Sequence, residues 1–201
     1  MQLPTSELTF RYLKHYLVLS IAFIVVYGGS NFLASQRSDR FQFFLSLEYH
    51  IPFVPQFIVI YLSVFALLFL PLFYIDISRI PALAKAFLFS LLVAGLIFII
   101  FPAELAHVRS ENVPIFPTLF SLLYTLALPH NLMPSLHIAF TVLFLSVCIE
   151  LESNRYIQCV FYAWGSLLFI SVLLMQQHQL IDLPTGALLG WSSYRLVYRH
   201  S

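Results

Sequence analysis

Four polar side chains stand out in a very apolar chain, and their types could support phosphate chemistry. His137, His178 and Asp182 are ionisable, and Ser135 is a hydroxyl two residues before His137. His178 and Asp182 are four residues apart in "HQLID", so on a helix they share a face. An aspartate beside a histidine fixes its tautomer and favours its protonated form. An ion pair that only anchors a helix end would have the same spacing, so this pair alone leaves both interpretations open.

The segment "MPSLHIAF" (133–140) adds the start of a helix to these side chains. Pro134 suits a first turn, and Ser135 can cap the helix or donate a hydrogen bond to an anion. The free amide groups at a helix start, together with the helix dipole, attract negative charge. Two histidines, a carboxylate and an anion-binding helix start suit phosphoryl transfer through a phosphohistidine. Polar groups at this position are then explained by a pocket that water can reach.

Composition places these residues in an integral membrane protein. The 201-residue chain is 60% hydrophobic and 9% charged, with a mean hydropathy of +0.88. Soluble domains carry about 25% charged residues. The net charge of +1 gives no reason to expect a nucleic-acid partner. We expect one all-α domain over residues 1–201, a polytopic protein with six transmembrane helices at about 13–34, 54–75, 84–101, 135–151, 156–175 and 180–197.

The connections between these segments predict an orientation. If all six span, the long 35–53 and 102–134 loops lie on one face, and the short turns and both termini lie on the other. The terminal face would carry more Lys and Arg, which places the termini in the cytoplasm. Compact size and short turns suggest a bacterial inner membrane. The two sets are Arg11, Lys14, Arg79, Lys85, Arg155, Arg195 and Arg199 on the terminal face, against Arg37, Arg40 and Arg109 on the long-loop face.

This topology brings the polar residues together at the outer ends of helices 3 to 6. His137 begins the fourth segment, and His178 and Asp182 join the fifth to the sixth. The site would then face the periplasm or the outside. The loop stretches 48–57 and 111–131 are rich in proline and aromatic residues, and they could form a hydrophobic lid, a lipid entrance, or both.

"PSLH", followed by "HQLID", resembles the type 2 phosphatidic acid phosphatase superfamily. The second motif of that family is Pro-Ser-Gly-His, and its third ends in His-x-x-x-Asp after a Ser-Arg pair. Leu136 in place of the glycine resembles the branch of inositol phosphorylceramide synthase-like proteins, as do "IPFVPQFIVIYLS" (51–63) and "FP" (101–102).

The resemblance implies a role for each matching residue. His178 corresponds to the nucleophile that takes the phosphoryl group, and Asp182 to the carboxylate that orients it. His137 corresponds to the acid that protonates the leaving alcohol and then activates the acceptor. Ser135 corresponds to a phosphate-binding residue. The resemblance implies a phosphorylated lipid substrate, with membrane lipids around the protein, and neither a metal nor another cofactor.

The chain also departs from the family pattern. Ser171 stands seven residues before His178, as the third-motif serine does, but Val172 replaces the arginine that follows. The first motif, Lys-x6-Arg-Pro, is absent. Arg109 is the only Lys or Arg between Lys85 and Arg155, so we nominate Arg109 and Ser171 as further phosphate-binding residues.

Three classes of function remain as alternatives. The preferred hypothesis is a metal-independent lipid phosphate phosphatase; a phosphotransferase that moves a phospho-headgroup to a lipid or sugar hydroxyl would share its phosphohistidine. A non-catalytic lipid-binding homologue would explain the missing cationic residues. A haem or metal protein that uses His137 and His178 is the third class.

Overall fold

The chain folds into a bundle of helices of unequal length. The computed structural model describes residues 3–110 and 113–201, and within these ranges it contains no β-strand. Three helical stretches are long and apolar enough to cross a membrane, which is compatible with an integral membrane protein. They are Ser6–Ser35, which joins α1 (Ser6–Phe23), the π-helical η1 (Ile24–Gly28) and α2 (Gly29–Ser35); Ile77–Ile100, which joins η5 (Ile77–Arg79) and α5 (Ile80–Ile100); and α8 (Arg155–Leu174).

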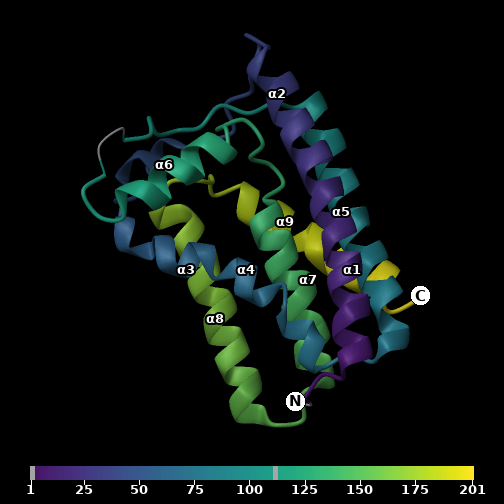
Figure 1. The fold of residues 1–201 in the computed structure, drawn as a ribbon. Helices are drawn as coiled ribbons and strands as arrows, with labels where there is room; N and C mark the ends of the chain where they lie inside the picture. The colour runs from purple at the N-terminus through teal and green to yellow at the C-terminus, as the bar shows by residue number, and fades with distance from the viewer. Residues whose placement is uncertain (1–2, 111–112) are drawn as a thin grey trace.

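The centre of the bundle is a close pair of helices, α7 (Leu136–Leu151) and α9 (Asp182–Ser192), the latter continuing as the π-helical η6 (Ser193–Tyr198). Gly186 and Gly190 face α7. A Cβ atom on Gly186 would collide with the backbone oxygen of Ser135, and one on Gly190 with that of Ala139. The "GALLG" sequence therefore lets two backbones approach closely, and this approach places the start of α9 beside the start of α7 (Figure 1).

The segment predicted as a helix over 54–75 is a series of short pieces. It comprises η3 (Pro55–Phe57), α3 (Ile58–Leu62), α4 (Val64–Leu67) and η4 (Leu70–Phe73). Ser63, at the first break, donates to the Ile60 carbonyl at 2.6 Å and accepts from the Trp164 indole at 2.8 Å. Pro71 lies in the last piece, where it has no amide to donate. Side-chain hydrogen bonding at Ser63 and the proline together explain why an apolar run of this length is not one straight helix.

The 102–134 segment, expected as a loop, contains a helix of its own. Here α6 (Pro117–Leu126) begins at a proline and lies near α3 at one end of the bundle (Figure 1). The 35–53 segment contains only the short 3-10 helix η2 (Ser46–His50).

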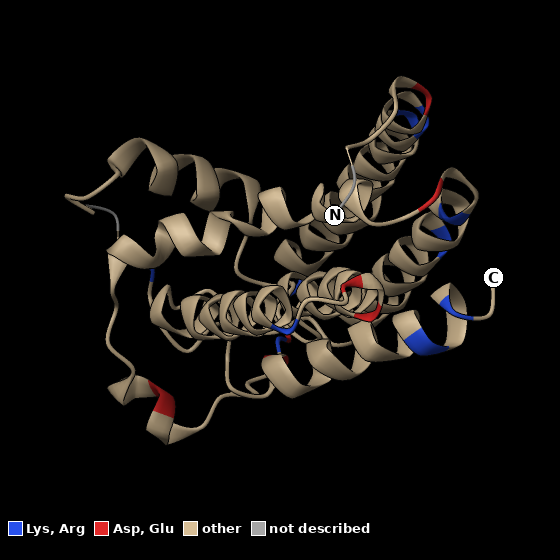
Figure 2. Cartoon of the chain, turned by 90° about the horizontal axis from the view of Figure 1, so that it is seen from below, with Lys and Arg blue, Asp and Glu red and all other residues tan. Residues whose placement is uncertain are grey.

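At each end of the bundle, hydrogen bonds join connections from distant parts of the chain. At one end, the Phe41 amide donates to the Pro102 carbonyl at 2.8 Å, so the two long loops are joined. At the other end, Arg79 donates to the carbonyl oxygens of Tyr198 and Ser201, which joins the turn before α5 to the C-terminus. Seen from below in Figure 2, charged residues gather at helix ends and connections, and long uncharged stretches lie between them.

Candidate functional site

His178 and Asp182 form a side-chain pair at the junction of α8 and α9. His178 lies in the turn that follows α8, and Asp182 is the first residue of α9. The His178 Nδ1 atom is 3.1 Å from Asp182 Oδ2, which also accepts the Gln179 amide at 2.7 Å. A carboxylate only accepts, so Nδ1 carries a proton, and in the neutral form of the ring Nε2 has the lone pair. Asp182 is fully buried, and its hydrogen bond to Nδ1 holds the imidazole in one orientation.

Ser135 lies against the Nε2 atom of His178. It is the N-cap of α7, where its Oγ accepts the Ile138 amide at 3.3 Å, and Oγ is 3.1 Å from His178 Nε2. The Ser135 amide in turn donates to the backbone carbonyl of Asp182 at 3.2 Å. The two motifs, 43 residues apart, are thus joined by one side-chain and one backbone contact.

His137 is the second histidine of the site. Its ring stacks on the ring of Tyr61, with centroids 4.2 Å apart and planes at 24°. Its Nε2 atom is buried and makes no hydrogen bond within the described part of the chain. His137 and His178 both face one cavity. This arrangement leaves an imidazole nitrogen able to exchange a proton with a group bound in the cavity.

Arg109 is placed beside the pair but is held by other groups. Its guanidinium donates to the Ala127 carbonyl and, at 2.9 Å, to the side-chain oxygen of Gln177, and it lies 4.8 Å from the ring centre of Tyr124. Burial lowers the pKa of Arg109. Because Gln177 precedes His178, this hydrogen bond joins the guanidinium to the residue next to the nucleophile candidate.

Ser171 occupies a different environment from the other predicted residues. It is fully buried on α8 and donates its hydroxyl hydrogen to the Leu168 carbonyl at 2.7 Å. Its side chain therefore bonds to its own helix. Its backbone carbonyl accepts the Met175 amide at the end of α8, so the residue contributes to the turn that carries His178.

A buried carboxylate that the sequence analysis did not single out fastens this turn. Glu48 is 2% exposed; its oxygens accept the Leu45 amide at 2.9 Å and the Leu180 amide at 3.1 Å. Two further side chains tie the turn to the long loops: Gln179 donates to the Glu104 carbonyl, and Gln176 donates to the Ile51 carbonyl at 2.9 Å. In the sequence, the feature that could have indicated this role of Glu48 is an acidic residue within a loop rich in aromatic residues and proline.

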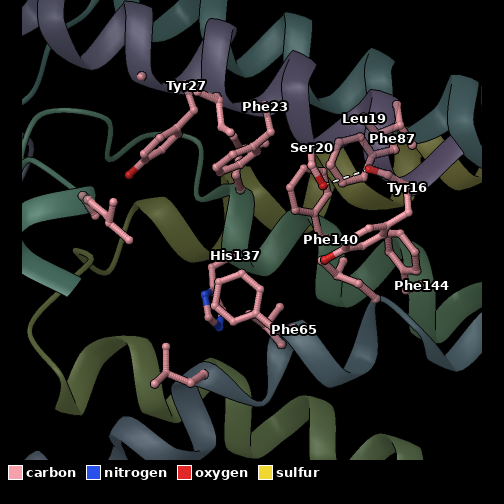
Figure 3. A pocket seen from close by; sticks show the side chains of 18 of the residues that line it. Tyr16, Leu19, Ser20, Phe23, Tyr27, Phe65, Phe87, His137, Phe140 and Phe144 are labelled. Carbon is pink, nitrogen blue, oxygen red and sulfur yellow. Dashed lines mark hydrogen bonds between the residues drawn. The ribbon is translucent and has the colours of Figure 1, made fainter. Parts of the chain in front are cut away.

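A cavity of about 660 Å³ opens beside the two histidines. It runs between the α1–η1 helix on one side and α3, α4 and α6 on the other, with α5 and α7 behind. Figure 3 shows His137 at one part of its wall and aromatic side chains along the rest. The lining includes Tyr16, Phe23, Tyr27, Phe65, Phe87 and Phe140. The polar site and an apolar space are therefore continuous.

Comparison with known proteins found no matching family model, curated protein or solved structure. Among residues 3–110 and 113–201, no three His, Cys, Asp or Glu side chains are grouped so that they could hold a metal ion.

Proposed function

We propose that this protein is an integral-membrane lipid phosphate phosphatase that works through a phosphohistidine on His178. The observation that carries the proposal is the Asp182–His178–Ser135 arrangement. A buried carboxylate holds Nδ1, and Nε2 lies beside a hydroxyl at the start of a helix. The resemblance of "PSLH" and "HQLID" to the type 2 phosphatidic acid phosphatases assigns the same roles to the same residues.

The chemistry follows from the geometry in two steps. The Nε2 lone pair of His178 attacks phosphorus and forms a P–N bond, while the P–O ester bond breaks and His137 gives its proton to the leaving alcohol. His137 then takes a proton from water, which attacks phosphorus, breaks the P–N bond and releases phosphate. Asp182 stabilises the positive imidazole ring formed in the first step.

Substrate phosphate would take the place of the Ser135–His178 contact. The Ser135 hydroxyl can turn from Nε2 to a phosphate oxygen, and Ser135 is the N-cap of α7, where the amides of the first helical turn favour an anion. Arg109 adds a positive charge nearby. It can reach an anion by giving up the Gln177 oxygen, or it can act at its present distance.

The membrane arrangement belongs to the same proposal. Six segments cross the membrane, the shorter helices among them, with the termini in the cytoplasm and the site facing the periplasm. The grouping of the two long loops at one end of the bundle supports this layout.

The direct test is phosphate release by the detergent-purified protein and its His178→Ala variant, without added metal, over a panel of lipid phosphates. We expect release by the wild type and a loss of several orders of magnitude in the variant. Equal release by both proteins would remove His178 from the mechanism. If neither releases phosphate, addition of lipid and sugar alcohols with a labelled donor tests the transferase alternative. No reaction with any acceptor would indicate a binding protein without turnover.

A further inference from the structure

One face of α1 forms a continuous apolar wall of the cavity. The lining residues Tyr12, Tyr16, Leu19, Phe23 and Tyr27 recur at spacings of three and four, so they follow a single helical face. At about 1.5 Å per residue this face is roughly 22 Å long. Because a membrane's hydrocarbon core is about 30 Å thick, the cavity extends through most of that depth.

The lining of this cavity changes along its length. His137 and His178 line the part beside the start of α7, and His15, whose Nδ1 atom is 2.9 Å from the Arg11 carbonyl oxygen, lines the part beside the first turns of α1. In this second part the Tyr12 hydroxyl donates to the Leu68 carbonyl, and the ring of Tyr16 lies 4.7 Å from that of Phe69. These contacts join α1 to the chain after α4 and form an aromatic floor.

Across from α1, the short helix α6 supplies a stripe of leucines. Leu119, Leu122, Leu123 and Leu126 all line the cavity, and Leu122 and Leu126 are also more than half exposed. A side chain that faces both the cavity and the outside marks an edge of the opening. The cavity can therefore be entered from the side between α6 and α1.

We propose that this cavity, named here the α1 groove, holds one hydrocarbon chain of a phosphorylated lipid lengthwise, with the phosphate at His178 and the chain end at the Tyr12–Tyr16 floor. The proposal rests on the proposed function for the phosphate end. The volume lies within the range of about 300–1,000 Å³ typical of ligand sites. A peptide segment does not suit it, since backbone amides would find few partners along an apolar wall.

The groove makes chain length a determinant of affinity. Each methylene that moves from water into an apolar wall strengthens binding about fourfold. For water-soluble alkyl phosphates of increasing length, assayed below their micelle concentrations, we expect KM to fall about fourfold per added carbon. The fall should stop once the chain reaches the floor.

Ser20→Phe is the variant that tests the floor. Ser20 lines the groove and its hydroxyl donates to the Tyr16 carbonyl, so a phenyl ring there shortens the space. We expect the KM series to level off several carbons earlier than in the wild type. Val18→Phe is the matched control, because Val18 is 60% exposed on the outer side of the same helix. The control should keep the wild-type series.

A photolabel gives a readout that does not depend on turnover. An alkyl phosphonate, which cannot be hydrolysed, carries a diazirine at its chain end and is crosslinked to the purified wild type. We expect labels on Tyr16, Leu19 and Ser20, and excess unlabelled phosphonate should remove them. Three results would overturn the groove proposal: labels on Leu17, Val18 and Ile21 alone, equal labelling of both faces of α1, or no label on either face. These three residues are each more than half exposed.

The two experiments distinguish a failure of the groove proposal from a failure of the phosphatase proposal. Competed labelling of the groove without phosphate release would refute the phosphatase and leave a lipid-binding groove. Phosphate release with labels on the outer face of α1, and the same KM series in Ser20→Phe, would refute the groove and leave the phosphatase.

Discussion

At the scale of single residues, Asp182 is the group on which the proposed nucleophile most depends. It is fully buried and holds both His178 Nδ1 and the Gln179 amide. Asp182→Asn keeps the shape, but the amide no longer stabilises a positive imidazole and can favour the wrong tautomer. We expect phosphate release to fall about 10²- to 10⁴-fold, as when a triad carboxylate is neutralised. Steady-state kinetics on the purified variant would measure the fall.

The matched control is Asp39→Asn. Asp39 lies in the long-loop end of the molecule and pairs with Arg37 at 2.6 Å, but its side chain is 71% exposed. Its pKa is lowered to about 2, mainly by the hydrogen bond from Arg37. An exposed pair contributes little, so this variant should retain wild-type turnover. If Asp182→Asn were as active as this control, the orienting role would be wrong.

Arg109 offers a second prediction at the same scale. Its flat guanidinium bonds to Ala127 and Gln177 while it lies over the Tyr124 ring. A lysine has one compact charge and cannot make this set of contacts. Arg109→Lys should raise KM for substrate about tenfold, with a smaller effect on kcat, in the same assay. Arg40→Lys is the control, because Arg40 bonds to the carbonyl oxygens of Ala34 and Ser35. Equal kinetics in the two variants would exclude Arg109 from phosphate recognition.

The sequence predicts these residues unevenly, for a physical reason. His178 and Asp182 could be found because ionisable residues are rare in apolar segments, and Ser135 because it stands at the predicted start of a helix; the structure brings the three together. Ser171 could be placed only by its spacing, and its hydroxyl bonds to its own helix. The sequence does not single out Glu48. Its role is to accept hydrogen bonds from the amides of Leu45 and Leu180, and the Leu180 amide approaches it only in the folded chain.

At the scale of elements, the approach of α9 to α7 sets the distance between the two motifs. Gly190→Ala would push a methyl group into the backbone of Ala139. Overpacking of this kind costs about 1–3 kcal/mol. We expect lower thermal stability in detergent and weaker activity, because the Ser135–His178 contact depends on the same packing. Gly29→Ala is the control: a Cβ there meets nothing within 4 Å. A Gly190→Ala protein as stable as the control would contradict this account of the pair.

The loop that carries Glu48 gives a prediction for the turn between α8 and α9. Glu48→Gln leaves one oxygen for two amide donors and turns an NH2 group towards one of them. An unsatisfied buried donor costs about 1–3 kcal/mol. The turn should loosen, which hydrogen exchange at residues 175–181 would detect, and kcat should fall. Glu104→Gln is the control, since Glu104 is exposed and its side chain accepts from the exposed Gln42 side chain at 2.9 Å. Equal exchange in both variants would show that Glu48 does not order the turn.

Elements were predictable where one pattern continued for long enough. The α5 and α8 segments are uniform apolar runs, and the predicted spans match their bounds closely. The 54–75 run is equally apolar, but its helix is interrupted at Ser63. The hydroxyl there accepts a hydrogen bond from the Trp164 indole of α8, a contact that the local sequence does not indicate. The ten residues of α6, which begin at Pro117, are too short to indicate a span, yet they are sufficient to line a cavity.

At the scale of the whole molecule, the distribution of charge predicts the orientation. Most Lys and Arg residues belong to the end with the termini, where Arg79 joins the C-terminus and Arg199 pairs with Glu150 at 3.2 Å. Positive charge is retained on the cytoplasmic side during insertion. The site is built from the opposite end, where the long loops meet. In this orientation the proposed phosphatase would act on the outer leaflet and release phosphate outside the cytoplasm.

Single cysteines at the two ends test this orientation. Ser38→Cys lies in a long loop and Ser153→Cys in the turn before α8, and both positions are exposed. In a background without Cys148 and Cys159, we expect an impermeant maleimide to label position 38 in intact cells or spheroplasts. Position 153 should react only after permeabilisation. The reverse pattern would place the site in the cytoplasm. Labelling of both positions from outside would require an even number of spans between them, whereas the six-segment layout has the three at 54–75, 84–101 and 135–151.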